Sequence, residues 1–303
     1  MNSHIHMNHY EDINSILNRL HIDSIVTNDI DAWTTFKYKN YNKIYNKLWL
    51  IEAQNIECGP IGTVPNKYPI VIKPIINLYG MSKGYKKINS ESDYYKNQNV
   101  GSFWMPYIKG RHYTIDIVFD KGVIIAYYAL ESKPSIHGTF KYHVYRPNYI
   151  LNHTLKVFMQ THFDNYTGLM NIEVINNSII EGHLRFNGDC YLYNDIFFKN
   201  IDCLMNGKSY TLKVKKKKLY LFPFFITGTI KSSTIHKHVI EDLLIKHGIT
   251  NIRWDDTTTL YQRDDLRRLF MFKVDTLSKG MYIIEQVQNI LFVIEQYMTH
   301  ISN

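Results

Sequence analysis

Residues 170–186 read MNIEVINNSIIEGHLRF, which is two strand-like segments joined across Asn176-Asn177-Ser178. Side chains alternate between the two faces of a strand, so this pattern predicts a β-hairpin with one polar and one apolar face. The second segment has Glu181, His183 and Arg185 on the polar face, and Ile180, Leu184 and Phe186 on the apolar face. One face is therefore suited to chemistry and the other to a core.

The spacing between Glu173 and Glu181 is the second signal in this hairpin. A three-residue loop at 176–178 would set the two carboxylates directly opposite each other across the ladder. Like charges in that position destabilise a sheet, so we expect a cation to lie between them. A two-residue loop would instead place the two side chains on opposite faces. An exposed polar face without a ligand is the alternative interpretation.

Composition indicates a globular protein of more than one domain. The chain has 303 residues, 45% of them hydrophobic and 20% charged, which allows a sizeable core. Three scattered cysteines with no CxxC spacing fit a reducing compartment. The N-terminus has no secretory pattern and no apolar run approaches ~18 residues, so we expect a cytoplasmic protein without a membrane partner. The abundance of Ile, Asn, Lys and Tyr resembles the coding bias of large DNA viruses and low-GC microbes.

The net charge of +8 suits an anionic ligand without selecting one. Part of the excess comes from residues 213–218, KVKKKK, which precede the apolar run LYLF. Lysines commonly protect the edge of a sheet, and we favour that interpretation. A localisation signal and a phosphate-binding strip remain alternatives.

Periodicity and turn residues predict a chain of mixed helices and strands. We expect helices at residues 10–20, 42–54, 147–163, 234–247 and 282–299. We expect strands at residues 22–26, 68–74, 100–108, 112–119, 123–132 and 249–254, a strand pair within 215–226, and a mobile substrate loop at 135–142. The charged residues of the last third look like surface charge and helix-end pairs, namely Asp255, Asp256, Asp264, Asp265, Arg267 and Arg268.

Lys73 ends the apolar strand Ile70-Val71-Ile72, and a loop with Gly80, Ser82 and Gly84 follows. An ammonium group at a strand end and backbone N–H donors in a loop are together suited to a polyphosphate. The loop does not match GxxxxGK[ST], which excludes a Walker-type P-loop. A lysine that merely extends from the strand end to solvent is the alternative.

The order of these features resembles the ATP-grasp superfamily over roughly residues 46–190. The order is a strand lysine, a glycine loop, an apolar hinge (WMPYIKG, 104–110), a carboxylate strand and then Glu-x-polar-x-Arg. The resemblance implies an α+β class and an ATP-grasp fold, in which two α+β subdomains grip a nucleotide. The implied divisions are a short N-terminal segment (1–46), an ATP-grasp domain (47–200, divided into 47–109 and 110–200) and an additional small α+β domain (201–303).

The resemblance also implies roles for individual residues. Those implied to bind ATP are Lys47 and Lys73 at the phosphates, Gly80, Ser82 and Gly84 in the loop that closes over them, Pro106 and Ile108 at the adenine, and His112 at the ribose. Those implied to hold Mg²⁺ are Glu173, Glu181 and His183. Arg185 and Lys73 are implied to be catalytic, since they stabilise the transferred phosphoryl group.

Two positions depart from the superfamily pattern. His183 stands where asparagine is usual, and imidazole favours Mn²⁺ or another transition ion over Mg²⁺. His112 stands where a ribose-binding glutamate is often found; its ring could still hydrogen-bond a ribose hydroxyl, and Asp116 is the nearest substitute carboxylate.

The implied function is an ATP-dependent ligase. It would phosphorylate a substrate carboxylate to an acyl phosphate, which an amine or thiol then attacks. The partners are therefore ATP and an unidentified small carboxylate or peptide, with Lys133, His137, Lys141 and Arg146 as candidate cations for that carboxylate. The alternative is a catalytically weakened nucleotide-binding or nucleic-acid-binding protein of the same fold. Nucleic-acid binding would place residues 213–218 beside exposed aromatics such as Tyr220 and Trp254.

Overall fold

The computed structural model describes residues 8–9, 13–78, 82–135, 139–187, 193–212, 217–227, 237–249, 251–254, 262–263 and 266–301. The helices are α1 (Ile13–Arg19), α2 (Asp29–Thr34), the 3-10 helix η1 (Phe36–Tyr45), α3 (Lys47–Glu52), α4 (Glu91–Tyr95), α5 (His153–His162), α6 (Asp195–Met205), α7 (Lys237–Lys246) and α8 (Leu277–Ile301). Strands β1 to β7 are Asn8–His9, Gly59–Pro60, Ile70–Pro74, Lys86–Ile88, Ser102–Pro106, His112–Asp120 and Val123–Pro134. Strands β8 to β14 are Phe140–Tyr145, Gly168–Ile175, Ser178–His183, Tyr220–Thr227, Asn251–Trp254, Gln262–Arg263 and Leu266–Val274.

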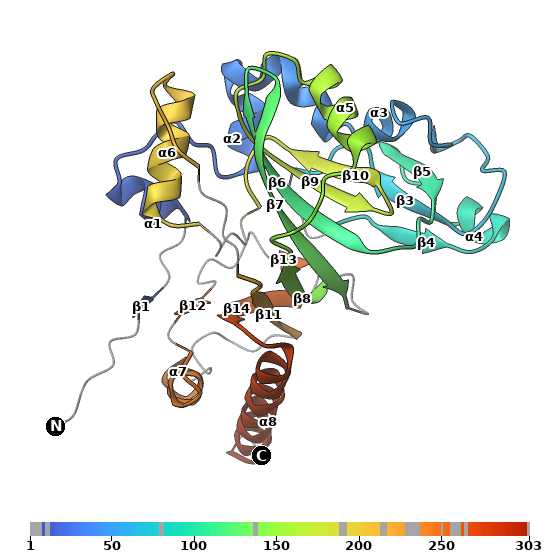
Figure 1. Ribbon diagram of the computed structural model, residues 1–303. Helices are drawn as coiled ribbons and strands as arrows, with labels where there is room; N and C mark the ends of the chain where they lie inside the picture. The colour runs from blue at the N-terminus through green and yellow to red at the C-terminus, as the bar shows by residue number, and fades with distance from the viewer. Residues whose placement is uncertain are drawn as a thin grey trace.

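The strands form two sheets (Figure 1). The large sheet has ten strands in the order β1-β12-β14-β11-β8-β7-β6-β9-β10, with β13 paired to β14. The small sheet has the order β2-β5-β3-β4 and lies beside the β9–β10 end of the large one. The β5–β6 connection, which contains the expected adenine hinge, links the two sheets. An α+β fold with mainly antiparallel pairing is therefore confirmed.

The large sheet buries both faces because its central strands alternate between two cores. Ile115 and Ile117 of β6 pack on one face under α2, η1, α3 and α5. Val118 of β6 packs on the opposite face with α1 and α6. His112 and Asp116 share the face of Val118, which we call the site face, because residues two apart point the same way. The polar residues of β6 therefore lie on the face that also approaches the small sheet.

The small sheet turns one side of β3 toward the large sheet. Ile70 and Ile72 pack in a cluster with Tyr94 of α4. Val71 packs on the other side, in a cluster that also contains Ile180 of β10. Alternation puts Lys73 on the side of Val71. The expected strand lysine therefore points into the space between the two sheets.

The predicted hairpin forms, but its loop is shorter than expected. Asn176 and Asn177 make a two-residue turn with φ of 48° and 64°, the left-handed conformation that type I′ turns require. A two-residue turn alone would separate Glu173 and Glu181 onto opposite faces. A β-bulge between Ile179 and Glu181 inserts one extra residue and restores the pairing of Glu181 with Glu173. The expectation of a three-residue loop is wrong, and the predicted opposition of the carboxylates is confirmed.

The bulge also redirects the apolar residues of β10. Ile179 takes the place in the core under η1 and α3, beside Leu184. Ile180 packs instead toward the small sheet. The expectation that Ile180 shares the face of Leu184 is therefore wrong, because a bulge reverses the alternation that precedes it. Gln54 stabilises this irregular region, since its side chain bonds both the backbone C=O (2.8 Å) and the backbone N–H (2.8 Å) of Ile179.

Gly182 allows η1 to approach β10 closely. A Cβ at this position would overlap the side chain of Ile44 of η1, which is fully buried. We expect Gly182→Ala to lower the free energy of unfolding by about 2 kcal/mol, the cost typical of overpacking a core. Urea denaturation measures this value. The Gly182→Ala/Ile44→Ala double variant should lose less than the sum of its single variants, and additive losses would contradict the contact.

Several elements differ from the sequence prediction. No strand forms at 22–26, because this segment packs its Ile22 and Ile25 onto the site face of the large sheet as irregular chain. The helix expected at 42–54 is divided at Asn46, whose side chain caps α3 by accepting a bond from Trp49 N–H. The helix expected at 147–163 begins only at His153. The substrate loop expected at 135–142 includes the start of strand β8. Residues 136–138 lie outside the described part of the chain.

The C-terminal third continues the large sheet. Strand β11 pairs with β8 on one side and with β14 on the other, so the described part of the expected strand pair within 215–226 contains a single strand, and residues 215–216 lie outside the described part of the chain. Helices α7 and α8 pack against β11 and β14 through an apolar cluster. Arg268 is buried in β14, which corrects its assignment to a charged surface. The division of the chain at residues 46, 109 and 200 stays a prediction.

The aromatic residues expected beside the basic run at 213–218 are partly buried, which disfavours an open nucleic-acid surface there. Residues 213–216 lie outside the described part of the chain. Trp254 is only partly exposed, and its indole N–H donates to Glu241 at 2.8 Å. Tyr220 is also partly buried.

Among the described helices, none combines the length and the apolar character needed to cross a bilayer.

Candidate functional site

Two lysines and two carboxylates meet between the sheets. Lys47 begins α3, and its Nζ lies 2.8 Å from Oε1 of Glu181 on β10. Burial lowers the pKa of Lys73, an effect that the charge of Lys47 reinforces and the charges of Glu181 and Glu173 oppose. These electrostatic interactions place Lys73 in the same group, although it comes from the small sheet. Lys47 and Lys73 are only 5% and 8% exposed, so their charges are concentrated in a low-dielectric site.

Lys47 is held by its backbone as well as by its charge. Its N–H donates to the backbone C=O of Ile75 at 2.9 Å, directly after β3. Asn46 caps the helix that Lys47 begins. Lys47 therefore connects the end of the small sheet, through its backbone, to Glu181 of the large sheet, through its side chain.

Glu173 is ionised and has its own histidine partner. Nε2 of His112 lies 3.0 Å from Oε2 of Glu173. Burial raises the pKa of Glu173, but the hydrogen bond and charge of His112, with the charges of His183 and Lys73, outweigh burial and bring the pKa to about 2. The His112 ring also packs against Phe140 with a centroid separation of 5.0 Å. His112 therefore lies at the carboxylates, and its expected contact with a ribose stays a prediction.

The pH dependence of stability should report this carboxylate. The folded-state pKa of about 2 lies below that of an unfolded glutamate, about 4.3, so Glu173 stabilises the fold above the unfolded value. This contribution is lost as the pH falls from about 4.3 toward 2. We expect wild-type stability to fall between pH 5 and pH 3 more steeply than that of Glu173→Gln, by up to about 1.4 kcal/mol per pH unit. Urea denaturation at each pH measures the slopes. Glu52→Gln, at an exposed position, should keep the wild-type slope.

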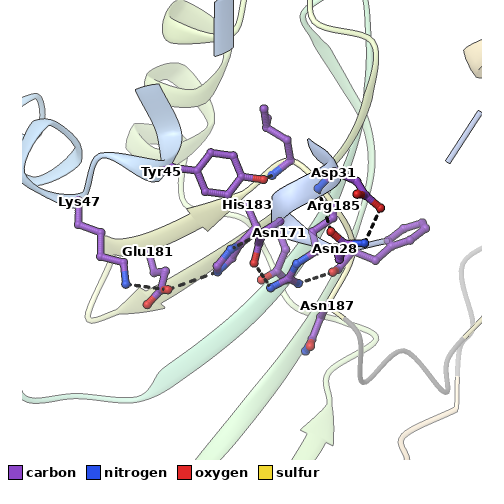
Figure 2. A network of polar contacts seen from close by, with 12 residues as sticks. Asn28, Asp31, Tyr45, Lys47, Asn171, Glu181, His183, Arg185 and Asn187 are labelled. Carbon is purple, nitrogen blue, oxygen red and sulfur yellow. Dashed lines mark hydrogen bonds and ion pairs between the residues drawn. The ribbon is translucent and has the colours of Figure 1, made fainter. Parts of the chain in front are cut away.

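Figure 2 shows Lys47, Glu181, His183 and Arg185 in one polar network, and a buried aspartate from the N-terminal segment completes it. Oδ1 of Asp29 lies 3.0 Å from Nδ1 of His183, and its Oδ2 lies 2.7 Å from Nη2 of Arg185. Burial raises the pKa of Asp29, but the charges and hydrogen bonds of His183 and Arg185 more than reverse this, so the pKa is far below its usual value. Nε2 of His183 lies 3.6 Å from Oε1 of Glu181. One chain of polar contacts therefore runs from Lys47 to Arg185.

Both ends of this chain of contacts, Lys47 and Arg185, are held by more than one partner. Arg185 also donates to the backbone C=O of Phe186 at 2.6 Å, so its guanidinium is fixed on two sides. Its side chain is 17% exposed. The Tyr45 hydroxyl accepts a bond from the backbone N–H of Leu184 at 3.1 Å, which holds the strand between His183 and Arg185 against η1.

Asp116 has a structural role. Its Oδ1 accepts bonds from the Asn171 amide (2.8 Å) and from the Asn187 backbone N–H (2.8 Å). Its Oδ2 accepts the Tyr193 hydroxyl at 2.8 Å. With three donors and 2% exposure, Asp116 does not fit the role of substitute ribose carboxylate. It instead ties β6 to β9 and to the segment after β10.

The expected phosphate loop is described in part. Gly80 lies outside the described residues. Ser82 and Gly84 both have positive φ, 51° and 75°. A Cβ on Gly84 would lie 2.7 Å from Cγ of Pro74, so only glycine allows the loop to return this close to Lys73. The loop residues described therefore do lie next to the strand lysine.

The expected hinge occupies the connection between the two sheets. Pro106 ends β5 opposite Ile70, and the following Tyr107 N–H donates to Pro69 C=O at 3.0 Å. Ile108 is half-buried in the apolar cluster between the sheets. The side of the hinge thus offers an apolar surface, and its contact with adenine stays a prediction.

Of the cations considered for a substrate carboxylate, Arg146 is engaged by Glu131, with Nε to Oε2 at 2.7 Å. Lys133 and Lys141 are exposed, and His137 lies outside the described residues. The structure therefore brings none of the described candidates into contact with the group around Glu181.

The donor set agrees with magnesium bound together with phosphates. Within the described residues, no three His, Cys, Asp or Glu side chains form a self-sufficient metal site. Mg²⁺ is usually held by one or two carboxylates plus substrate phosphates rather than by an all-protein cage. Glu173 and Glu181, opposite each other across the ladder, supply two such carboxylates. The residues present thus fit a metal that arrives with a nucleotide.

Sequence reasoning missed Asp29 and Gln54. The sequence Asn28-Asp29-Ile30-Asp31 has the form of a capped helix start, and the Asn28 side chain does accept a bond from Asp31 N–H at 2.8 Å. This signal could have located α2. It carries no information on the contact of Asp29 with His183, since 154 positions separate them.

Comparison with known proteins gives structural but not sequence matches. No protein-family model matches the sequence, and no curated protein matches it. The structure is similar to N5-carboxyaminoimidazole synthase of Aspergillus clavatus, solved with ADP and 5-aminoimidazole ribonucleotide (TM-score 0.58, 14% identity, 85% of this chain and 75% of that chain). It is also similar to N5-carboxyaminoimidazole ribonucleotide synthetase of Thermus thermophilus (0.56, 10%, 90% and 82%). A third match is the L-amino acid ligase of Bacillus licheniformis (0.55, 9%, 83% and 72%).

These matches cover most of this chain and most of each neighbour. All three neighbours are ATP-grasp enzymes, and their identities of 9–14% carry a conclusion about architecture only. The ATP-grasp architecture is the one expected from residues 170–186 and from Lys73. The chain therefore has the ATP-grasp fold.

Proposed function

We propose that this protein is an ATP-dependent ligase that activates a substrate carboxylate as an acyl phosphate for attack by an amine or a similar nucleophile. The observation that carries the proposal is the convergence of Lys47 and Lys73 on the paired carboxylates Glu173 and Glu181. Two buried cations suit a triphosphate, and two opposed carboxylates suit its metal. The titles of the structural neighbours name synthases, synthetases and a ligase, which supports the same reaction class.

The proposed chemistry has two steps. A carboxylate oxygen of the substrate attacks the γ-phosphorus of ATP, and the bond to the β,γ-bridging oxygen breaks, so that ADP leaves with the electron pair. The nucleophile then attacks the acyl carbon, the bond to the phosphate oxygen breaks, and inorganic phosphate leaves as the nucleophile loses its proton. Both steps develop negative charge on phosphoryl oxygens, which preorganised cations stabilise.

Each residue in the group has a proposed task. Lys47 and Lys73 bind and orient the phosphates, and in the absence of a nucleotide Glu181 compensates their charge. Glu173 and Glu181 hold Mg²⁺, with Mn²⁺ as an alternative because of His183; the bound ion would neutralise charge on the phosphates. Ser82, Gly84 and Gly80 close over the phosphates. Pro106 and Ile108 bind the adenine, and His112 lies close enough to Glu173 to orient it.

Two of the cations that could bind the substrate carboxylate are arginines that already have acidic partners. Arg185 and Arg146 already contact Asp29 and Glu131. A substrate carboxylate bound at either arginine would therefore share that cation with its acidic partner. We propose a small carboxylate or a peptide as the substrate class.

The test is release of ADP by the purified protein with Mg²⁺ and ATP, assayed against pools of amino acids and small carboxylic acids. A stimulating pool is divided until one acid remains, and hydroxylamine then traps the acyl phosphate as a hydroxamate. We expect Glu181→Gln to lower the stimulated rate by at least about 100-fold, because it removes a metal ligand and the partner of Lys47. Glu52→Gln, at an exposed position, should behave as wild type. Binding of Mg²⁺-ATP without turnover by any acid or nucleophile would refute the ligase proposal.

A second candidate function is a catalytically weakened nucleotide-binding protein of the same fold. The contact of Arg185 with Asp29 favours it, since a buried carboxylate neutralises the arginine proposed to stabilise the phosphoryl group. Tight binding of Mg²⁺-ATP without ADP release would support this candidate. Binding of nucleic acid through residues 213–218 is disfavoured by the partial burial of Tyr220 and Trp254.

A further inference from the structure

We infer that Asp29 is a positioning residue that sets His183 as a nitrogen ligand, paired with Glu181, for a transition ion such as Mn²⁺ in the nucleotide complex. This inference deepens the proposed function and rests on it. Asp29 comes from α2, in the N-terminal segment, and is 4% exposed. Its carboxylate contacts His183 through one oxygen and Arg185 through the other.

The contacts of His183 assign its tautomer. An ionised carboxylate only accepts hydrogen bonds, so the 3.0 Å contact between Asp29 Oδ1 and Nδ1 of His183 requires a proton on Nδ1. The separation of 3.6 Å between Nε2 and Glu181 Oε1 is too long for a hydrogen bond. Nε2 is therefore free of a proton when the ring is neutral, and its lone pair is available on the side of Glu181.

Both carboxylates next to His183 have a further cation as a partner. Asp29 is already paired with Arg185 at 2.7 Å, and Glu181 is already paired with Lys47 at 2.8 Å. Both carboxylates therefore keep a cation when Nε2 of His183 binds a metal ion, and coordination displaces any proton from that nitrogen. The neutral ring is the form that coordinates metals.

The distance between the two donor atoms fits a shared ion. Neighbouring ligand atoms that are each about 2.1 Å from an octahedral ion are about 3.0 Å apart, so the two atoms, observed at 3.6 Å, need to approach by only about 0.6 Å. Oε1 is also the oxygen that Lys47 contacts at 2.8 Å, and because a carboxylate oxygen has two lone pairs it can face an ion and accept from Lys47. A metal-bound histidine whose other nitrogen donates to a carboxylate is the usual way in which proteins fix such a ligand.

The combination of nitrogen and oxygen donors has a consequence for metal choice. Mg²⁺ prefers oxygen ligands, whereas Mn²⁺ and later first-row ions also accept imidazole. Because the described part of the protein supplies fewer than three clustered donors, the nucleotide phosphates must complete the coordination. We therefore expect the nucleotide complex to prefer Mn²⁺ to Mg²⁺ by at least about tenfold in Kd.

The experiment measures Mn²⁺ binding to the full chain in the presence of β,γ-methylene-ATP, which has no nitrogen in its phosphate chain. Continuous-wave EPR gives the free Mn²⁺ concentration, and competition with Mg²⁺ gives the ratio of the two Kd values. Pulsed EPR detects the coupling of Mn²⁺ to an imidazole nitrogen. Neither readout depends on turnover.

Three variants separate the roles. His183→Asn keeps the Asp29–Arg185 pair, and it should abolish the nitrogen coupling and reduce the preference for Mn²⁺ about tenfold. Asp29→Asn should weaken Mn²⁺ binding by roughly 10- to 100-fold, the range seen when the carboxylate partner of a ligating histidine is removed. Asp23→Asn makes the same charge change at an exposed site in the same N-terminal segment and should match wild type.

If Asp29→Asn fails to fold, the Asp29→Asn/Arg185→Met double variant removes the unpaired guanidinium and is measured in the same way. A wild-type complex without nitrogen coupling overturns the inference, and so does unchanged Mn²⁺ affinity in the Asp29 variants. If Mg²⁺ and the analogue bind normally in that case, the proposed function stands. Failure of the wild type to bind the analogue with either ion overturns the proposed function itself.

Discussion

Replacement of Lys73 by methionine should lower ATP-dependent turnover on the order of 1,000-fold in kcat/KM. Lys73 lies near the end of β3 on the side that faces the large sheet, where the charges of Glu181 and Glu173 act on it. Methionine keeps the apolar stem and removes the charge that would lie at the phosphates. The affinity for Mg²⁺-ATP, measured by calorimetry, should fall together with the rate of ADP release.

The same substitution should leave the fold intact. Burial already disfavours the charged form of Lys73, which is why its pKa is lowered, so removal of the charge relieves a desolvation cost. Glu181 keeps Lys47 as a partner, and Glu173 keeps His112. Lys86→Met, at an exposed position on the adjacent strand β4, is the matched control and should retain activity. Wild-type nucleotide affinity in Lys73→Met would remove this lysine from the phosphate site.

Asp29→Ala should lower the free energy of unfolding by about 3 kcal/mol, because it leaves a partly buried guanidinium without its carboxylate. The loss is measured by urea denaturation at pH 6. The Asp29→Ala/Arg185→Met double variant should lose less than the sum of the two single variants, since it also removes the unpaired charge. Asp23→Ala, at an exposed position, should change stability by less than about 0.5 kcal/mol. Additive losses in the double variant would contradict a coupled pair.

The cost of Asp29→Ala should also depend on pH. His183 and Arg185 hold the pKa of Asp29 far below its unfolded value of about 3.9. The carboxylate therefore stabilises the fold fully above about pH 3.9, and this stabilisation is lost as the pH falls below that value toward the folded-state pKa. The difference between wild type and variant should be smaller at pH 3 than at pH 6. An unchanged difference would show that the carboxylate stabilises the protein by packing alone.

The predictions that held depend on local geometry. Alternation along β10 placed Glu181 and His183 on one face, and the observed register pairs Glu181 with Glu173. The loop length was wrong because both Asn176 and Asn177 adopt the left-handed conformation and close a two-residue turn. The pairing nevertheless holds because the bulge at Ile179 adds the residue that the turn lacks. The local sequence pattern does not predict that bulge. Its hydrogen bonds come from Gln54, which follows α3.

Two expected elements, the helix at 42–54 and the strand at 22–26, also differ from the structure because local patterns do not include tertiary contacts. The Asn46 cap and the 3-10 helix before it divide a segment whose apolar spacing predicts one helix. The segment 22–26 has strand propensity but packs as irregular chain, because no neighbouring strand in the described structure pairs with it. Propensity describes a residue and its neighbours in sequence, whereas a strand also requires a partner.

The sequence by itself determined the polar face of the hairpin, the strand lysine at residue 73 and the order of motifs that resembles ATP-grasp proteins. These features follow from alternation and spacing, which act over a few residues. Only the tertiary structure decided that Lys47 contacts Glu181 and that Asp29 joins His183 to Arg185. Asp29 and His183 are 154 positions apart. Such a contact forms only when helices and sheets pack together, so no local pattern in the chain encodes it.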